Sequence, residues 1–149
     1  MKKIEEKDKE YWLTPPEIYK KLDEEFHFDF DPCPYPRPDE YNSLLPTIEW
    51  GDSNYINPPF RLKDTADGKG GPTAFARRAI EEFKNNGKES VLMLPVQSYV
   101  NLLLEAGAEL RSMKRVRWVS GKTGEAWKGP TSIALFILKK KKKKSTDTA

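Results

Sequence analysis

The sequence predicts a single α/β domain with parallel strands at the centre of its sheet. Short apolar runs typical of strands alternate with amphipathic segments typical of helices, and the length of 149 residues suits one domain. One run, Ser90–Leu94, is apolar almost throughout, as expected of a strand buried on both faces. A hydrophobic fraction of 37% beside a charged fraction of 33% is typical of a folded globular chain.

The first expected helix covers about Pro15–Glu25. Thr14 is its expected cap, and Glu17 suits the positive end of the helix. The next segment, Phe26–Asp31, alternates apolar and polar residues and therefore predicts a strand, which Pro32 would stop.

A second strand is expected at Asn54–Ile56, where the prolines that follow would end it. Residues 39–53 are predicted to be irregular, with at most one helical turn. Residues 61–73 are rich in glycine and predict a flexible loop.

The second half of the chain predicts two helices and three strands. Ala74–Asn86 has apolar residues at helical spacing and ends at Gly87, and a further helix covers about Ser98–Ala106. Beyond the buried run described above, Val116–Val119 and Ser132–Leu138 flank a glycine-rich connection, so we expect them to form a terminal antiparallel pair.

Composition excludes several classes of protein. No apolar run approaches the roughly 20 residues of a membrane span, and no apolar stretch follows the N-terminus as in a secretory signal. A single cysteine excludes an internal disulfide, and one cysteine with one histidine is too few for the usual zinc site built by a protein. We therefore expect a cytoplasmic protein with no membrane partner and no metal.

The positive charge is concentrated at the C-terminus. The chain has a net charge of +3, but Lys139–Lys144 is a run of six lysines, and the rest of the chain carries a net charge of −3. We expect a flexible N-terminus over residues 1–10, a domain over 11–138 and a disordered lysine-rich tail over 139–149. The tail is either a solvated end or a non-specific contact to phosphates.

Two polar segments follow predicted strands and form the candidate site, Asp31–Cys33 and Asn57–Phe60. Ligands of α/β sheets bind beyond the carboxyl ends of the strands. In the second segment, the side-chain oxygen of Asn57 and the carbonyl of Pro58 can accept the two hydrogens of a conjugated amino group. Such contacts favour the pyramidal nitrogen that attacks a methyl group, and Phe60 can stack on a base.

These segments resemble the motifs of amino-group methyltransferases. Asn57–Phe60 resembles the catalytic N-P-P-Y/F tetrapeptide, and Trp12–Glu17 resembles the T-P-P-E segment that contacts the cofactor. Phe30–Cys33 resembles the first-strand motif, and Val91–Pro95 is similar to a later strand of the family. The order of the motifs is most similar to phage-type DNA N6-adenine methyltransferases, over residues 11–100 and weakly to 138.

The resemblance implies a compact, shortened Rossmann-like sheet and the transfer of a methyl group from S-adenosylmethionine to N6 of adenine. The substrate would be double-stranded DNA with the target base flipped out. The catalytic residues implied are Asn57, Pro58, Pro59 and Phe60. The cofactor-binding residues implied are Trp12, Thr14, Pro15, Asp31, Pro32, Cys33 and Asn57. Contacts to nucleic acid are expected from Phe60, Arg61, Lys63, Lys69, Arg77 and Arg78.

Other parts of the expected site are less specific. Asp39, Glu40 and Asp52 are candidates for the carboxylate that binds the cofactor ribose, and Tyr35 for stacking on its adenine. The loop of residues 61–72 is expected to close over the nucleic acid. No recognition domain is evident, and a homodimer is one arrangement that would supply recognition.

Several single residues have structural interpretations. His27 is expected to be a partly exposed strand residue, and Cys33 a small packing residue. Trp50, Trp118 and Trp127 are expected in the core or at its rim.

The tetrapeptide leaves the substrate open. Cytosine N4, RNA adenine and protein glutamine each present a conjugated amino group of the same kind. A non-catalytic nucleic-acid-binding module of the same fold is the alternative from a different class.

Overall fold

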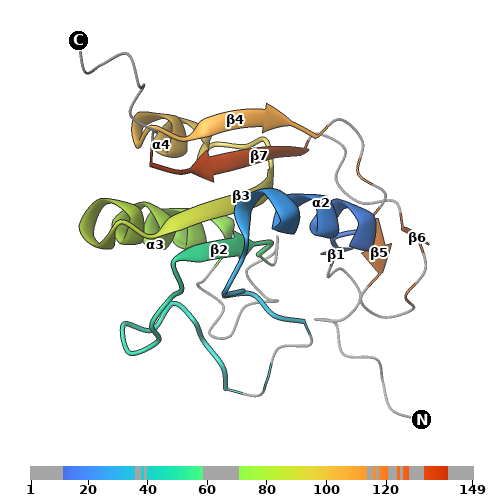
Figure 1. Cartoon of the computed structure of the whole chain (residues 1–149), viewed down its shortest axis with the longest axis horizontal. Coiled ribbons are helices and arrows are strands. Elements are labelled where there is room, and N and C mark those ends of the chain that lie inside the picture. Colours follow the sequence, from blue (N-terminus) through green and yellow to red (C-terminus); the bar gives the residue numbers. More distant parts are fainter. Residues whose placement is uncertain are drawn as a thin grey trace.

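The computed structural model describes residues 12–35, 38, 40–58, 71–113, 116, 118–120, 124, 126–127 and 133–140. Its main sheet has four strands in the order β2-β3-β7-β4 (Figure 1). β2 (Ser53–Ile56) and β3 (Glu89–Pro95) are parallel. β7 (Ile133–Leu138) is antiparallel to β3, and β4 (Glu109–Ser112) is antiparallel to β7 at the edge.

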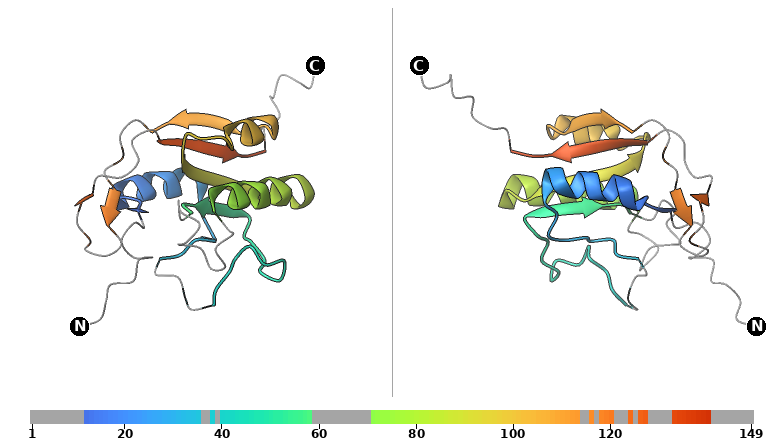
Figure 2. Two further views of the ribbon diagram at one scale, coloured as in Figure 1. Left: turned by 180° about the vertical axis from the view of Figure 1, so that it is seen from behind. Right: turned by 45° about the vertical axis from the view of Figure 1, so that its right-hand side comes forward.

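Helices cover both faces of this sheet. α2 (Pro16–Phe26) lies on one face, whereas α3 (Pro72–Asn86) and α4 (Val100–Glu105) lie on the other (Figures 1 and 2). The mixed α/β class is therefore confirmed, and β2 and β3 are parallel as expected. The parallel pair does not lie at the centre of the sheet, because β2 is its end strand and the central pair, β3 and β7, is antiparallel. α3 connects β2 to β3 as the crossover that two adjacent parallel strands require.

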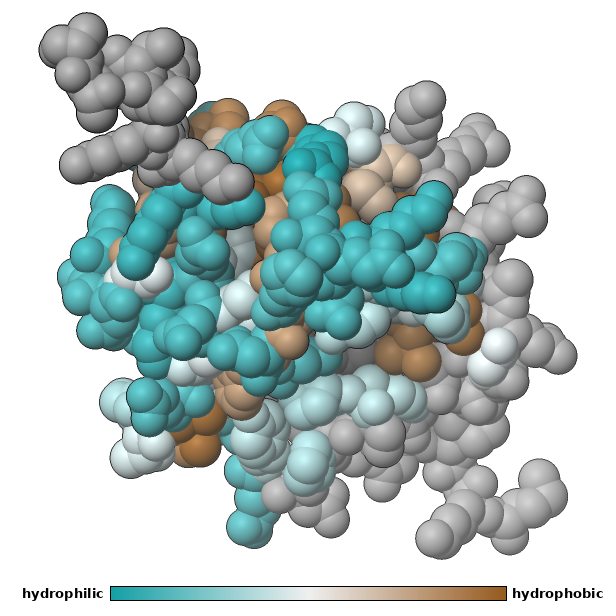
Figure 3. All heavy atoms as spheres, in the orientation of Figure 1, coloured by the Kyte–Doolittle hydropathy of each residue, from teal (hydrophilic) through white to brown (hydrophobic). Residues whose placement is uncertain are grey.

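The strands divide their side chains between two apolar clusters. On β3, Leu92 and Leu94 pack toward α3, and Val91 and Met93 pack toward α2. Every residue of β3 after Glu89 is buried, as the apolar run predicted. The outer face of α2 is hydrophilic (Figure 3) and carries the exposed residues Glu17, Lys20, Lys21, Glu24 and Glu25.

A second, smaller sheet lies beside the first. It has the order β1-β5-β6 and joins Trp12–Leu13, Trp118–Ser120 and Ala126–Trp127. β1 and β5 are antiparallel, with Leu13 opposite Val119. The N-terminal segment is thus held by a strand more than a hundred residues away in the sequence.

The helix predictions are confirmed with small shifts. α3 begins two residues earlier than expected and ends at Gly87, which adopts a φ of 67° and donates its N–H to the Phe83 carbonyl at 3.1 Å. α2 is displaced by one residue. α4 is shorter than expected because residues 98 and 99 form a turn before it.

The expected capping role of Thr14 is wrong. Pro15 occupies the N-cap of α2 and makes no side-chain cap bond, while Pro16 opens the helix and Glu17 lies in its first turn. The Thr14 hydroxyl is bonded elsewhere, to Tyr55.

The strand expected at Phe26–Asp31 is also wrong. Phe26 is the last residue of α2, and His27 takes a left-handed conformation with a φ of 52° that ends the helix. The amide of His27 donates to the Asp23 carbonyl at 2.7 Å, and that of Phe28 donates to the Asp23 carboxylate at 2.9 Å. Phe30 alone pairs with the sheet, by a parallel bridge to Asn54. His27 is exposed, as expected, but at a helix end.

The terminal antiparallel pair has different members from those expected. The strands at 118–120 and 133–138 belong to different sheets, and the antiparallel partners of β7 are β3 and β4. β4 was not predicted from the sequence, since three of its four residues are exposed and show no alternation. An edge strand of this kind is recognisable only from its pairing.

Candidate functional site

The candidate site lies at the carboxyl edge of β2, where two distant segments run side by side. The amide of Tyr55 donates to the Phe30 carbonyl at 3.0 Å, and the amide of Asp29 donates to the Ser53 carbonyl at 2.9 Å. These bonds align residues 29–30 in parallel with β2. Asp31 and Asn57 therefore leave the sheet at the same edge, although 26 positions separate them in the sequence.

A buried asparagine fixes the start of β2. Asn54 is fully buried and donates from Nδ2 to the carbonyls of Gly51 and Glu89, each at 2.9 Å. Its Oδ1 accepts the Gly51 amide, also at 2.9 Å. Gly51 is needed there because a Cβ at this position would lie 2.3 Å from Asp29 Oδ1. Asn54 is a functional-site neighbour that the motifs do not contain, although a polar residue inside a short buried strand is a usable signal.

Only the first half of the tetrapeptide can be placed. Asn57 is 7% exposed and its side-chain oxygen is shielded from solvent, and Pro58 is also buried. Pro59, Phe60, Arg61, Lys63 and Lys69 lie outside the described residues, as does most of the loop expected to close over nucleic acid.

Asp31 combines exposure with a perturbed pKa. The residue is exposed, yet desolvation by the surrounding protein raises the pKa of its carboxyl to about 6, against the opposing bond from the Cys33 amide at 2.8 Å. The residue is thus open to solvent although much protein lies around its carboxyl. It is mostly ionised at pH 7 and presents a negative charge there.

The two residues after Asp31 are structural. Pro32 and Cys33 are buried, and the Ser43 hydroxyl donates to the Pro32 carbonyl at 2.5 Å. Burial raises the pKa of the Cys33 thiol well above its usual range, so the thiolate is disfavoured. Cys33 packs in the cluster beneath α3, which confirms its expected packing role.

Thr14 reaches the main sheet through its side chain. Its hydroxyl is hydrogen-bonded to that of Tyr55 and lies 3.7 Å from the Met93 sulfur. The carbonyl of the buried Pro15 accepts the amides of Ile18 and Tyr19 in the first turn of α2. For Trp12 the backbone lies in β1, and the side chain is outside the described part.

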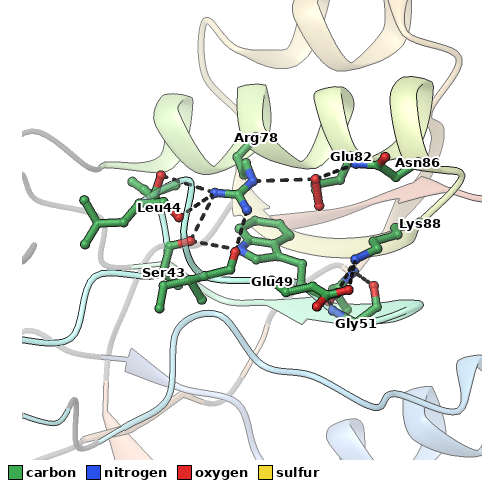
Figure 4. A network of polar contacts seen from close by, with 12 residues as sticks. Ser43, Leu44, Glu49, Gly51, Arg78, Glu82, Asn86 and Lys88 are labelled. Atoms are coloured by element: carbon green, nitrogen blue, oxygen red, sulfur yellow. Dashed lines mark hydrogen bonds and ion pairs between the residues drawn. The ribbon is translucent and has the colours of Figure 1, made fainter.

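Arg78 is a structural clamp, and its expected contact with nucleic acid is not supported by this geometry (Figure 4). Its guanidinium donates to the carbonyls of residues 43, 44, 45 and 48 at distances from 2.7 to 3.3 Å. It also lies 5.0 Å from the ring centroid of Trp50 and 3.9 Å from Glu82. These contacts commit its donors to the segment between Asp31 and β2, whereas the neighbouring Arg77 is exposed.

The other candidates are spread over the molecule. Asp52 precedes β2 and so lies at the opposite end of that strand from Asn57, which argues against a shared site. Glu40 is exposed with a φ of 62°, Tyr35 is partly buried, and Asp39 is outside the described residues. Trp50 and Trp118 are 2% and 0% exposed, which confirms their place in the core, while the Trp127 side chain is not described.

The lysine run leaves the fold far from Asn57. Lys140 follows β7, and its amide donates to Glu89 Oε2 at 2.8 Å, at the amino end of β3. Lys139 Nζ lies 5.6 Å from the ring centroid of Phe26. Because β7 is antiparallel to β3, the run starts at the edge of the sheet opposite to the candidate site.

Within the described ranges, no group of three or more histidine, cysteine or acidic side chains could hold a metal ion. No helix in the same part of the chain is long and apolar enough to cross a membrane. Comparison with known protein families, with curated protein sequences and with solved structures found no significant match.

Proposed function

We propose that this chain is an S-adenosylmethionine-dependent methyltransferase that acts on an exocyclic amino group of a nucleobase, N6 of adenine in DNA. One observation carries the proposal. Three motif segments that are far apart in the sequence, around Thr14, Asp31 and Asn57, meet at the carboxyl edge of β2 and β3.

The sheet supports the same proposal. Its parallel pair, β2 and β3, continues into the antiparallel strands β7 and β4, which is compatible with the shortened sheet that the resemblance implies. The carboxyl edge of the parallel strands is where such sheets bind ligands.

The charge at the site fits the cofactor. When bound, S-adenosylmethionine supplies an electrophilic methyl group on a sulfonium, and its amino acid portion carries an ammonium. Asp31 presents an accessible carboxylate whose desolvation strengthens its attraction for a cation. Asp31 and the Thr14–Pro15 segment are the described residues that would hold the cofactor.

Asn57 and Pro58 would act on the substrate amino group. The Asn57 Oδ1 and the Pro58 carbonyl accept its two N–H bonds, which directs the nitrogen lone pair away from the ring and toward the methyl donor. As the new nitrogen–carbon bond forms, the bond between the methyl group and the sulfonium would break and leave a neutral thioether, and the proton that the nitrogen loses would pass to solvent. Asn57 is buried, so its oxygen acts in a surrounding of low polarity, where such hydrogen bonds are stronger than in water.

The test is methyl transfer from labelled S-adenosylmethionine to DNA, RNA and protein in parallel. We expect label in DNA, on N6 of adenine after hydrolysis to nucleosides. Asn57→Ala is expected to lower kcat by at least about a hundredfold, while calorimetry shows nearly unchanged cofactor affinity.

Asn101→Ala is the matched control, because Asn101 is exposed on α4 and its loss should not affect transfer. Parental activity of the Asn57 variant would exclude the assigned mechanism. Absence of cofactor binding by the parent protein would instead favour a non-catalytic nucleic-acid-binding module. Label confined to RNA or protein would move the proposal to that substrate.

A further inference from the structure

We infer that Tyr55 is a positioning residue for the proposed reaction, because its hydroxyl anchors the Thr14 segment on the main sheet beside Asn57. The inference rests on the proposed function and adds a residue that the motifs do not contain. Tyr55 acts through Thr14 and has no direct contact with cofactor or substrate assigned to it.

The anchor is a closed triangle of three side chains. The hydroxyls of Tyr55 and Thr14 are hydrogen-bonded to each other. The Met93 sulfur lies 3.3 Å from the Tyr55 oxygen and 3.7 Å from the Thr14 oxygen. One hydroxyl proton therefore lies between the two oxygens and the other can point to the sulfur, a weak acceptor.

Packing holds the Tyr55 ring in one place. The side chain is 3% exposed, and its ring centroid lies 5.1 Å from that of Tyr19 and 5.2 Å from that of Phe28. Burial raises the pKa of Tyr55, so the hydroxyl keeps its proton at neutral pH. A phenylalanine at this position would preserve the ring contacts and lose only the hydrogen bond.

The triangle lies at the level of the candidate site. Ile56 of β2 pairs with Leu92 of β3, so Met93 is one step further along β3, as Asn57 is along β2. Thr14 is therefore held beside Met93, at the level of Asn57 and just beyond the carboxyl end of β2.

The backbone next to Thr14 pairs with the smaller sheet, whereas the Thr14 side chain is bonded to the main sheet. Immediately before it, β1 pairs with β5 in the smaller sheet, which shares no strand with the main sheet. Immediately after it, α2 packs on the face of the main sheet. The hydroxyl of Tyr55 thus ties this junction to β2, the strand that carries Asn57.

The test compares Tyr55→Phe, Thr14→Val and the double variant in the full chain. We expect each single variant to weaken S-adenosylmethionine binding by about three- to tenfold in calorimetry and to raise its KM by the same factor, with kcat nearly unchanged. The double variant should bind no more weakly than Thr14→Val alone, because Tyr55 acts only through the Thr14 hydroxyl.

Hydrogen exchange supplies a readout that does not depend on activity. Tyr55→Phe should speed exchange of the Leu13 amide in β1 and leave amides of β3 protected. Tyr99→Phe is the matched control, because it removes another buried hydroxyl, which donates to the Pro95 carbonyl and not to Thr14. It should leave cofactor affinity unchanged.

The outcomes separate the two proposals. If the parent protein binds no S-adenosylmethionine, the proposed function fails and this inference fails with it. If the parent binds it and Tyr55→Phe binds equally well, the inference alone is overturned. Additive losses in the double variant, or unchanged exchange at Leu13, would also overturn it, since Tyr55 would then not act through Thr14.

Discussion

At the scale of single residues, Asp31 is a carboxylate in an environment that disfavours its ionised form. The folded protein raises the pKa of Asp31 to about 6, which means that desolvation disfavours the carboxylate form. The nearby Cys33 amide offsets only part of this effect. A carboxylate in such a setting is typical of binding sites, and its natural partner is a cationic ligand.

The raised pKa of Asp31 predicts a pH dependence of stability. A folded-state pKa above the ordinary value means that this group stabilises the fold fully below about pH 4, and that the contribution is lost as pH rises through about 6. We therefore expect Asp31→Asn to melt at a higher temperature than the parent at pH 7, by a few degrees at most because solvent screens the exposed side chain. Thermal melts between pH 4 and 7.5 measure this, and parallel curves for the two proteins would contradict it.

At the scale of elements, α3 covers one face of the sheet and also holds an irregular segment of the chain in place. Its Arg78 holds the irregular segment that lies between Asp31 and β2 by bonds to four backbone carbonyls (Figure 4). Lys88, just beyond the helix, donates to the Trp50 carbonyl at 2.6 Å. The described part of this segment forms neither helix nor strand, so its carbonyls need such partners.

Adjacent arginines on α3 make a matched test of that clamp. Arg78→Met keeps the apolar stem and leaves the four carbonyls without their donor, so we expect the free energy of unfolding to fall by about 2 kcal/mol. Arg77→Met removes an exposed cation and should change it by less than about 0.5 kcal/mol, while weakening DNA binding if Arg77 contacts phosphate. Urea denaturation measures the free energy of unfolding of both variants. Equal losses for the two would show that Arg78 does not stabilise the fold through these bonds.

At the scale of the whole molecule, the described start of the lysine run and the candidate site lie at opposite edges of the sheet. Asn57 follows the carboxyl end of β2, while the lysine run begins beside Glu89 at the amino end of β3. Lys139 and Lys140, the described start of the run, therefore lie away from Asp31 and Asn57. Any contribution of the run to nucleic-acid binding would be electrostatic and independent of the reacting base.

Truncation after Lys140 tests this separation and keeps the described end of β7 intact. It removes Lys141–Lys144, so at low salt we expect weaker DNA binding and a salt dependence of log K that is shallower by up to about 3 to 4. The kcat at saturating DNA should not change. Replacing the same four lysines by arginine is the control and should retain binding; identical salt slopes for parent and truncated protein would exclude the tail.

Local signals in the sequence determined the helices and the two parallel strands, β2 and β3. Proline marked the start of α2, Gly87 marked the end of α3, and the apolar run marked β3. Helix termini and burial on both faces require particular residue types at neighbouring positions. The segments of the candidate site were also evident as strings of residues. For Asn57 and Asp31 the chain then provides the shared edge that the fold rule led us to expect.

Only the tertiary structure decided which residues are hydrogen-bond partners and which strands pair. Thr14 was a plausible helix cap and Arg78 a plausible phosphate ligand, but both side chains are used by residues 30 to 41 positions away. β4 and the small sheet form only because their strands pair with segments distant in the sequence. Residues Phe26–Asp31 alternate as a strand would, but α2 extends to Phe26 and the segment is not a strand. Hydrogen-bond partners and strand neighbours depend on which segments the packed core brings together, and no local sequence pattern encodes that choice.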